Sequence, residues 1–189
     1  MMPQNPPVPA AAQVRFRWLW FAAIAIVGAW LVRDRLTELP AIGASTTVTE
    51  LSSGATLSAR IDTGAAMCSI HCDEVLPPDL NEPVNADRLV DEHAIEGVGR
   101  PIRFRIRDDA GKPHWIEASL SHVAYIRVGN HPALRYCVNL PIRVAGVEAT
   151  VMVTLNNRSR MKYPFLLGRN FLKDRFVVDV RVDDDDVIF

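Results

Sequence analysis

The most informative segment of the sequence is Ala59-Arg60-Ile61-Asp62-Thr63-Gly64-Ala65. Apolar and polar side chains alternate as far as Ile61, which is typical of a half-buried β-strand, and an Asp-Thr-Gly turn follows at once. Asp62 is therefore expected at the fixed end of a strand, with the small hydroxyl of Thr63 beside it and Gly64 where backbones approach closely. A simpler interpretation is an Asx turn, in which the carboxylate only caps its own backbone.

A second segment supports a catalytic interpretation; it reads Phe165-Leu166-Leu167-Gly168-Arg169-Asn170-Phe171-Leu172. A hydrophobic strand before Asp-Thr-Gly-Ala, followed much later by Leu-Leu-Gly-Arg-Asn and a short helix, resembles the paired signature of retropepsin-like aspartic proteases. The resemblance implies a mainly β, single, closed domain with one short C-terminal helix, in which the Leu-Leu-Gly segment packs beside the catalytic loop. It assigns catalytic roles to Asp62, Thr63 and Gly64. It assigns supporting roles to Ala65, Leu167, Gly168, Arg169 and Asn170.

The chain is more similar still to a bacterial retropepsin-like family that is named for ATP-dependent zinc proteases. The similarity rests on Ile61 to Ala65, on His71, and on residues 153–158 and 161–169, within a region of roughly residues 48 to 180. It points to a binding role for His71. A histidine that is satisfied by a backbone carbonyl is the equally simple alternative.

The sequence departs from the viral members of this group in two ways. The spacing between Asp62 and Gly168 is longer, which implies extra strands or loops. Ala66 and Met67 replace the acidic residues that usually follow Asp-Thr-Gly-Ala, so Arg169 is expected to lack its usual partner.

The sequence predicts neither a metal site nor a nucleotide cofactor. The five histidines form no His-Glu-x-x-His pair, and no Gly-x-x-x-x-Gly-Lys-Ser/Thr loop occurs. The cluster of Cys68, His71, Cys72 and Asp73 offers zinc-type ligands but lacks a second half-site. Cys68 and Cys72 stand where the bacterial family has Ser and Ala, and burial as small apolar side chains is the commoner fate of free cysteines.

Peptide hydrolysis by this chemistry needs two carboxylates, one ionised to activate water and one protonated to polarise the carbonyl. The chain has one Asp-Thr-Gly and no Asp-Ser-Gly, so Asp62 of a second copy must supply the other carboxylate. The sequence thus predicts a homodimeric aspartic endopeptidase that acts on peptide or protein substrates. Two alternatives stay open: a non-catalytic protein that binds a peptide or cell-envelope ligand on the same fold, and a metal-dependent hydrolase.

An uncharged apolar run from Trp18 to Val32 lies near the N-terminus, and arginines flank it on both sides. As a helix the run is about 22 Å long, shorter than the roughly 30 Å of a bilayer core, so the predicted transmembrane anchor extends over residues 14–32 with snorkelling arginines. A cleaved signal peptide and a buried helix are the alternatives. The free N-terminus favours a cytoplasmic tail and an exported domain, which would be periplasmic in a bacterium.

Composition divides the chain into five parts. They are a disordered Pro-rich tail (residues 1–13), the transmembrane anchor (14–32), a linker (33–45), the retropepsin-like protease domain (46–181) and an acidic C-terminal tail (182–189). The net charge of -1 provides no overall attraction to nucleic acid, so the expected partners are a second copy, a peptide or protein substrate and the membrane.

Period-2 alternation predicts the strands of the domain. The expected elements are a hairpin of residues 46–51 and 56–61, a strand through Ile102, Phe104 and Ile106, a long hairpin of residues 138–153 that turns at Ala145-Gly146, one or two helical turns at 169–174, and a last strand at 176–180. Residues 73–92 are expected to form a loop or insertion, and residues 126–136 are a candidate flap over the cleft.

Overall fold

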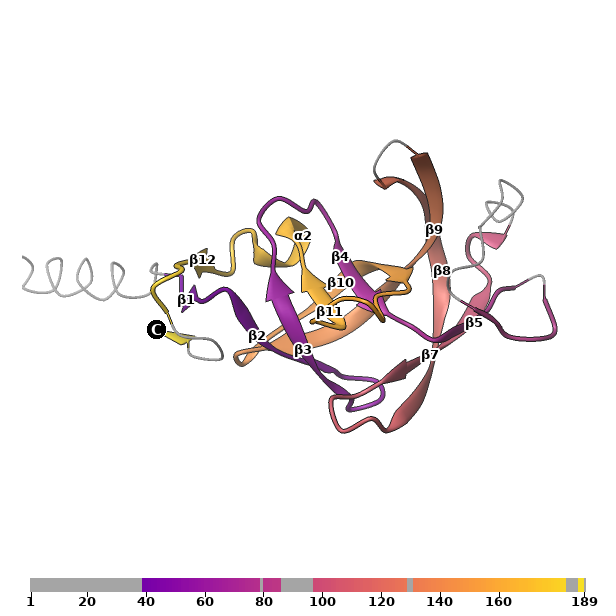
Figure 1. The fold of residues 1–189 in the computed structure, drawn as a ribbon, viewed down its shortest axis with the longest axis horizontal. Coiled ribbons are helices and arrows are strands. Elements are labelled where there is room, and N and C mark those ends of the chain that lie inside the picture. Colours follow the sequence, from indigo (N-terminus) through magenta and orange to yellow (C-terminus); the bar gives the residue numbers. More distant parts are fainter. Residues whose placement is uncertain (1–38, 79, 86–96, 129–130, 183–186, 189) are drawn as a thin grey trace, which may run out of the picture. The chain divides into compact units, whose positions relative to one another are not determined.

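The computed structural model describes residues 39–78, 80–85, 97–128, 131–182 and 187–188 (Figure 1). The predicted tail and transmembrane anchor, residues 1–13 and 14–32, lie outside these ranges. Within them, no helix combines the length and the apolar character that a membrane crossing requires.

The described residues form a mainly β structure with one short helix. The elements are β1 (Ala41–Ile42), β2 (Ser45–Glu50), β3 (Thr56–Ile61), β4 (Cys68–His71), β5 (Glu74–Leu76), β6 (Val84–Asn85), β7 (Pro101–Arg107), β8 (Pro113–Val128), β9 (His131–Val144), β10 (Val147–Asn156), β11 (Phe165–Leu167), α2 (Arg169–Leu172), β12 (Val177–Val178) and β13 (Val187–Ile188).

Six of the described strands close into a barrel in the order β10-β4-β11-β3-β2-β9, because β9 also pairs with β10. The short strand β11 lies between β3 and β4, parallel to β3 and antiparallel to β4. β3 and β4 are the strands on either side of the Asp-Thr-Gly turn. The barrel therefore places the Leu-Leu-Gly segment against that turn, with Leu167 opposite Ile61.

The long strand β8 connects the barrel to a second group of strands. Its first half pairs with β7, and its second half pairs with β9 after an irregularity between Leu120 and His122. β7 also pairs with β5, and β5 pairs with β6, both antiparallel. The hairpin of β8 and β9 extends beyond the barrel in Figure 1. The candidate flap, residues 126–136, falls in this hairpin, and residues 129–130 at its turn lie outside the described residues.

The core confirms the alternation that the sequence predicts. Ile102, Phe104 and Ile106 of β7 are fully buried, and so are the inward residues of β9, Val138, Leu140, Ile142 and Val144. On the other face of β7, Arg103 and Arg107 are exposed and Arg105 is half-buried. Removing one such large apolar side chain from water contributes about 1.5–3 kcal/mol, so these strands alone supply a sizeable share of the driving force for folding.

The hairpin of β2 and β3 and the long hairpin of β9 and β10 are confirmed, whereas several shorter elements differ from the predictions. The strand predicted at residues 176–180 covers only Val177–Val178. The helix, Arg169–Leu172, is the shorter of the two lengths that the sequence allowed. The stretch expected to be a loop, residues 73–92, contains β5 and β6. Two strands that the sequence did not indicate, β1 in the linker and β13 in the acidic tail, pair with each other.

Candidate active site

Asp62 lies directly after β3, at the point where that strand leaves the barrel. Its backbone N–H donates to the carbonyl of Leu167 at 3.0 Å, so β11 fixes its position. Its Oδ1 accepts the N–H groups of Gly64 and Ala65 at 2.9 and 3.1 Å. These contacts include the Asx turn of the simpler interpretation. The carboxylate is nevertheless half-buried, and among the described residues Oδ2 accepts no hydrogen bond, so one oxygen is available for chemistry.

Gly168 allows the start of α2 to lie against the turn. A Cβ atom at this position would sit 2.5 Å from both the carbonyl carbon and the oxygen of Met67, which is closer than real Cβ atoms come. The next two residues donate to the same turn, Arg169 N–H to Ala65 at 2.9 Å and Asn170 N–H to Ala66 at 3.2 Å. Only glycine permits this approach, which explains the Gly of the Leu-Leu-Gly segment.

Arg169 finds a partner that the sequence did not indicate. Its Nη1 donates to the carbonyls of Thr63 and Gly64 at 2.9 and 2.8 Å. The sequence indicated only that the usual acidic partner of Arg169 is missing; here the guanidinium binds the turn through backbone carbonyls instead. Thr63 and Gly64 themselves are exposed.

Asn170 holds the far side of the turn. Its Oδ1 accepts the backbone N–H of Cys68 at 3.0 Å and its thiol at 3.1 Å, and its Nδ2 donates to the carbonyl of Met152 at 2.8 Å. Burial raises the pKa of the Cys68 thiol to about 11, so this cysteine is a hydrogen-bonded core residue without nucleophilic character.

The Cys68 to Asp73 cluster does not come together as a set of ligands. Cys68 and Cys72 are fully buried on the core side of the strand, as free cysteines. His71 lies on the opposite face because side chains alternate along a strand. Among the described residues, no group of three or more His, Cys, Asp or Glu side chains is arranged to hold a metal ion.

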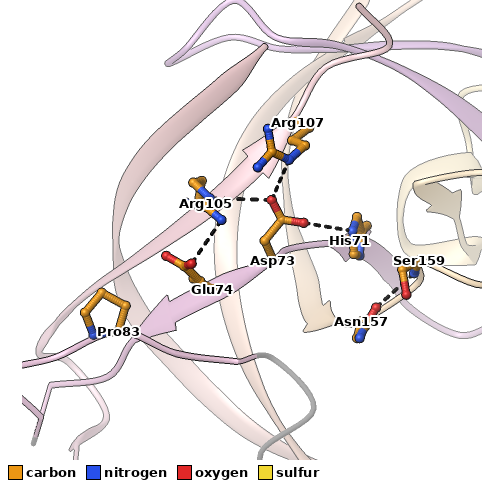
Figure 2. A pocket seen from close by; sticks show the side chains of 8 residues that line it. All are labelled: His71, Asp73, Glu74, Pro83, Arg105, Arg107, Asn157 and Ser159. Atoms are coloured by element: carbon orange, nitrogen blue, oxygen red, sulfur yellow. Dashed lines mark hydrogen bonds and ion pairs between the residues drawn. The ribbon is translucent and has the colours of Figure 1, made fainter. Parts of the chain in front are cut away.

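His71 lines a separate pocket of about 470 Å³ (Figure 2). It lies three residues along β4 from Cys68, about 10 Å away, so it is not part of the Asp62 turn. The pocket is polar and is centred on Asp73, which faces His71 Nε2 at 3.3 Å, Arg105 Nε at 3.4 Å and Arg107 Nε at 2.8 Å. The Arg107 contact is an ion pair without the alignment of a hydrogen bond. Arg105 also reaches Glu74 at 3.0 Å.

Arg158, which the sequence did not single out as functional, lies in the segment after β10, where its N–H donates to His71 Nδ1 and its Nε donates to the carbonyl of Tyr163. Burial of its guanidinium lowers its pKa, as do the charges of Arg135 and Arg60, whereas the charge of Asp62 raises it. Arg158 and His71 are far apart in the sequence and no motif links them; β10 pairs in parallel with β4, so its end lies beside His71.

Comparisons with known proteins agree with the fold and with part of this interpretation. Residues 95–183 match the family described as RimB-like, Retropepsin-like aspartic endopeptidase RimB. The matched segment contains Gly168, Arg169 and Asn170, and it begins after the Asp-Thr-Gly turn. No curated protein matches the chain.

Among solved structures, the chain is similar to the crystal structure of Lpg0085, a protein of unknown function (DUF785) from Legionella pneumophila subsp. pneumophila str. Philadelphia 1. The two share 25% sequence identity with a TM-score of 0.57, over 76% of this chain and 95% of the other. Neither comparison supports the zinc part of the family name given above.

Proposed function

We propose that this protein is a membrane-anchored aspartic endopeptidase that hydrolyses peptide bonds as a homodimer. The observation that carries the proposal is the construction of the Asp62 turn. One carboxylate oxygen is held by two backbone amides, the turn is fastened by the backbone of β11 and by Arg169, and the second oxygen is left unbonded among the described residues. A fixed carboxylate with one available oxygen is what activation of a water molecule requires.

The mechanism uses Asp62 of each chain. The two carboxylates hold one water molecule and share one proton, because two such groups in one site do not both ionise readily. The ionised carboxylate takes a proton from the attacking water, and the protonated one donates to the carbonyl oxygen of the scissile bond. Thr63 and Gly64 are exposed in the single chain, so a second chain can approach the turn. We expect a bell-shaped activity profile over about pH 4 to 6, where the pair carries a single proton.

Two other elements fit the proposal. The hairpin of β8 and β9 is the candidate flap that would cover a bound peptide and exclude water. Residues 14–32 would anchor each chain in the membrane with the domain on the exported side, and this would raise the effective concentration of a weakly associating pair.

The test is proteolysis by the full-length protein in detergent, with an unfolded protein as substrate. We expect cleavage that a statine-type transition-state mimic blocks and that a metal chelator does not affect. Asp62→Asn preserves shape but cannot exchange a proton, so we expect turnover to fall by at least about a thousandfold while the circular dichroism spectrum stays the same.

Each failure has a distinct meaning. Undiminished cleavage by Asp62→Asn would disprove the mechanism. A dimeric wild-type protein that binds peptides over this pH range without cleaving them would be a binding protein on the same fold. Loss of cleavage on chelation would favour a metal-dependent hydrolase.

A further inference from the structure

The pocket around Asp73 combines equal numbers of positive and negative side chains. Its described charged lining consists of Asp73, Glu74, Arg105 and Arg107, which form ion pairs with one another (Figure 2). His71 adds no charge, because its Nδ1 accepts a backbone N–H and therefore carries no proton. A polyanion such as nucleic acid is bound by an excess of basic residues, and a calcium or magnesium ion by several unpaired carboxylates. The pocket therefore favours a ligand without net charge.

Polar atoms of both kinds remain available after these ion pairs have formed. Within the described residues, Arg107 Nη2 and Ser159 Oγ make no hydrogen bond, and Glu74 pairs through Oε1 alone. The guanidinium donates, the carboxylate accepts, and the hydroxyl does both. An ionised carboxylate or phosphate could only accept, and an ammonium group could only donate. A ligand that uses all three atoms must donate and accept, as the hydroxyl groups of a sugar do.

An exposed aromatic ring lies next to the pocket on the same face of the sheet. Arg105 of β7 is opposite Trp115 of β8 on one side and opposite Glu74 of β5 on the other, so the three side chains share this face. The Arg105 guanidinium lies 5.9 Å from the centre of the Trp115 ring. The Trp115 side chain is 41% exposed, and residues 113–119 of β8 pair with no second strand in the described part of the chain. The open part of the ring offers an apolar surface on which the C–H groups of a sugar can pack.

We propose that the Asp73 pocket and Trp115 together form a binding site for a neutral oligosaccharide, with one sugar hydrogen-bonded in the pocket and a neighbouring sugar packed on the tryptophan ring. Arg105 belongs to both parts and joins them. The pocket volume of about 470 Å³ lies within the usual range of small-molecule sites. Each planar guanidinium or carboxylate group presents two atoms side by side, which matches two neighbouring hydroxyls of a sugar. The site is separate from the Asp62 turn, so binding does not depend on catalysis.

The first test measures binding of the full-length protein, in a detergent without a sugar headgroup, to an array of neutral and sulfated oligosaccharides at about pH 7.5, where histidine is neutral. We expect binding of a neutral oligosaccharide in preference to sulfated ones. Isothermal titration calorimetry then gives the Kd of the neutral oligosaccharide that binds best. The peptide trialanine, which carries both an ammonium and a carboxylate group, should not displace it. Binding of no neutral oligosaccharide, a preference for sulfated chains, or displacement by trialanine would overturn the inference.

The second test removes the aromatic surface. Trp115→Ala should weaken the Kd for the neutral oligosaccharide at least about tenfold, because the packing on the ring is lost. Tyr125→Ala is the matched control: Tyr125 is another exposed aromatic side chain of β8, in the half of the strand that pairs with β9. It should leave the Kd unchanged. An unchanged Kd in Trp115→Ala, or equal losses in the two variants, would contradict the proposal.

The third test changes the charge balance. Asp73→Asn preserves the shape of the side chain but leaves the arginines in excess, so we expect about tenfold weaker binding of the neutral oligosaccharide and new binding of sulfated ones. Asp108→Asn is the control, because Asp108 also faces a histidine, His114 at 2.9 Å, in the turn between β7 and β8. It should change neither. Wild-type binding of both classes by Asp73→Asn would contradict the charge argument. Circular dichroism checks the folding of each variant, and Trp115→Ala decides the matter if Asp73→Asn does not fold.

Discussion

At the scale of single residues, the site contains backbone contacts so close that no side chain fits between them. Gly168 is the clearest example, because any Cβ there meets the backbone of Met67 at 2.5 Å, and backbone cannot move aside as a flexible side chain can. Gly64 is less constrained: its added Cβ would meet only Asp62 Oδ1, at 3.1 Å. The structure therefore gives a stronger steric reason for glycine at position 168 than at position 64.

We therefore expect Gly168→Ala to lower the free energy of unfolding by about 3 kcal/mol, the upper end of the cost of overpacking. Gly111→Ala is the matched control. Gly111 has φ +81° with open space around it, so the same change should cost only about 1 kcal/mol, from the left-handed backbone. Urea unfolding followed by circular dichroism measures both. Similar losses in the two variants would show that the contact with Met67 relaxes freely.

The residues of the Asp62 turn could be predicted because they form a contiguous motif whose chemistry is local. Arg158 and the carbonyl partners of Arg169 could not. Arg169 donates to the backbone carbonyls of Thr63 and Gly64. Every residue has a backbone carbonyl, so the amino-acid types at these two positions do not reveal the contact. Arg158 contacts His71 and the carbonyl of Tyr163, and no motif in the sequence indicates these contacts.

At the scale of elements, a strand could be predicted where apolar and polar side chains alternate clearly along it, and not elsewhere. The hairpin of β9 and β10 alternates over residues 138–153 and is found as predicted there. β8 is not, because the irregularity between Leu120 and His122 shifts which side chains face inward halfway along the strand. β4 buries Cys68, Ser69 and Ile70 in succession, so it shows no alternation. β1, β12 and β13 have two residues each, too few for any period.

The turn of the long hairpin offers a test at this scale. Ala145 and Gly146 both have positive φ, 47° and 80°, as a type I′ turn requires, and alanine is strained in that region. Ala145→Asn should raise the free energy of unfolding by about 0.5–1 kcal/mol, since asparagine tolerates positive φ better than alanine.

The control is Ala110→Asn, the same replacement in the exposed turn between β7 and β8, where alanine does not have positive φ. We expect no measurable change there. A gain of equal size at both positions, measured as the midpoint of urea unfolding, would mean that asparagine acts through something other than the backbone conformation of the hairpin.

At the scale of the whole molecule, the barrel brings together two segments about a hundred residues apart. Periodicity predicts β3 and β11 as separate apolar runs, but neither run indicates that β11 lies between β3 and β4 in the sheet. That contact was anticipated only through the resemblance to retropepsin-like proteases. Its physical basis is visible in the structure: the N–H of Asp62 and the carbonyl of Leu167 satisfy each other where both strands end.

The proposed dimer leads to the strongest prediction at this scale, because the activity of dimers that contain one wild-type and one variant chain shows whether one site needs both chains. If each site needs Asp62 from two chains, a mixed dimer of wild-type and Asp62→Asn chains has a single ionisable carboxylate and should be inactive. Full-length protein co-expressed with equal amounts of the two chains would then show about a quarter of the wild-type activity, since only about a quarter of randomly formed dimers are wild type in both chains. Activity near one half would mean that each chain acts alone, with its second catalytic group within the same chain. Differently tagged subunits allow the mixed dimers to be purified and assayed separately, and substantial cleavage by that fraction would contradict a site shared between two copies.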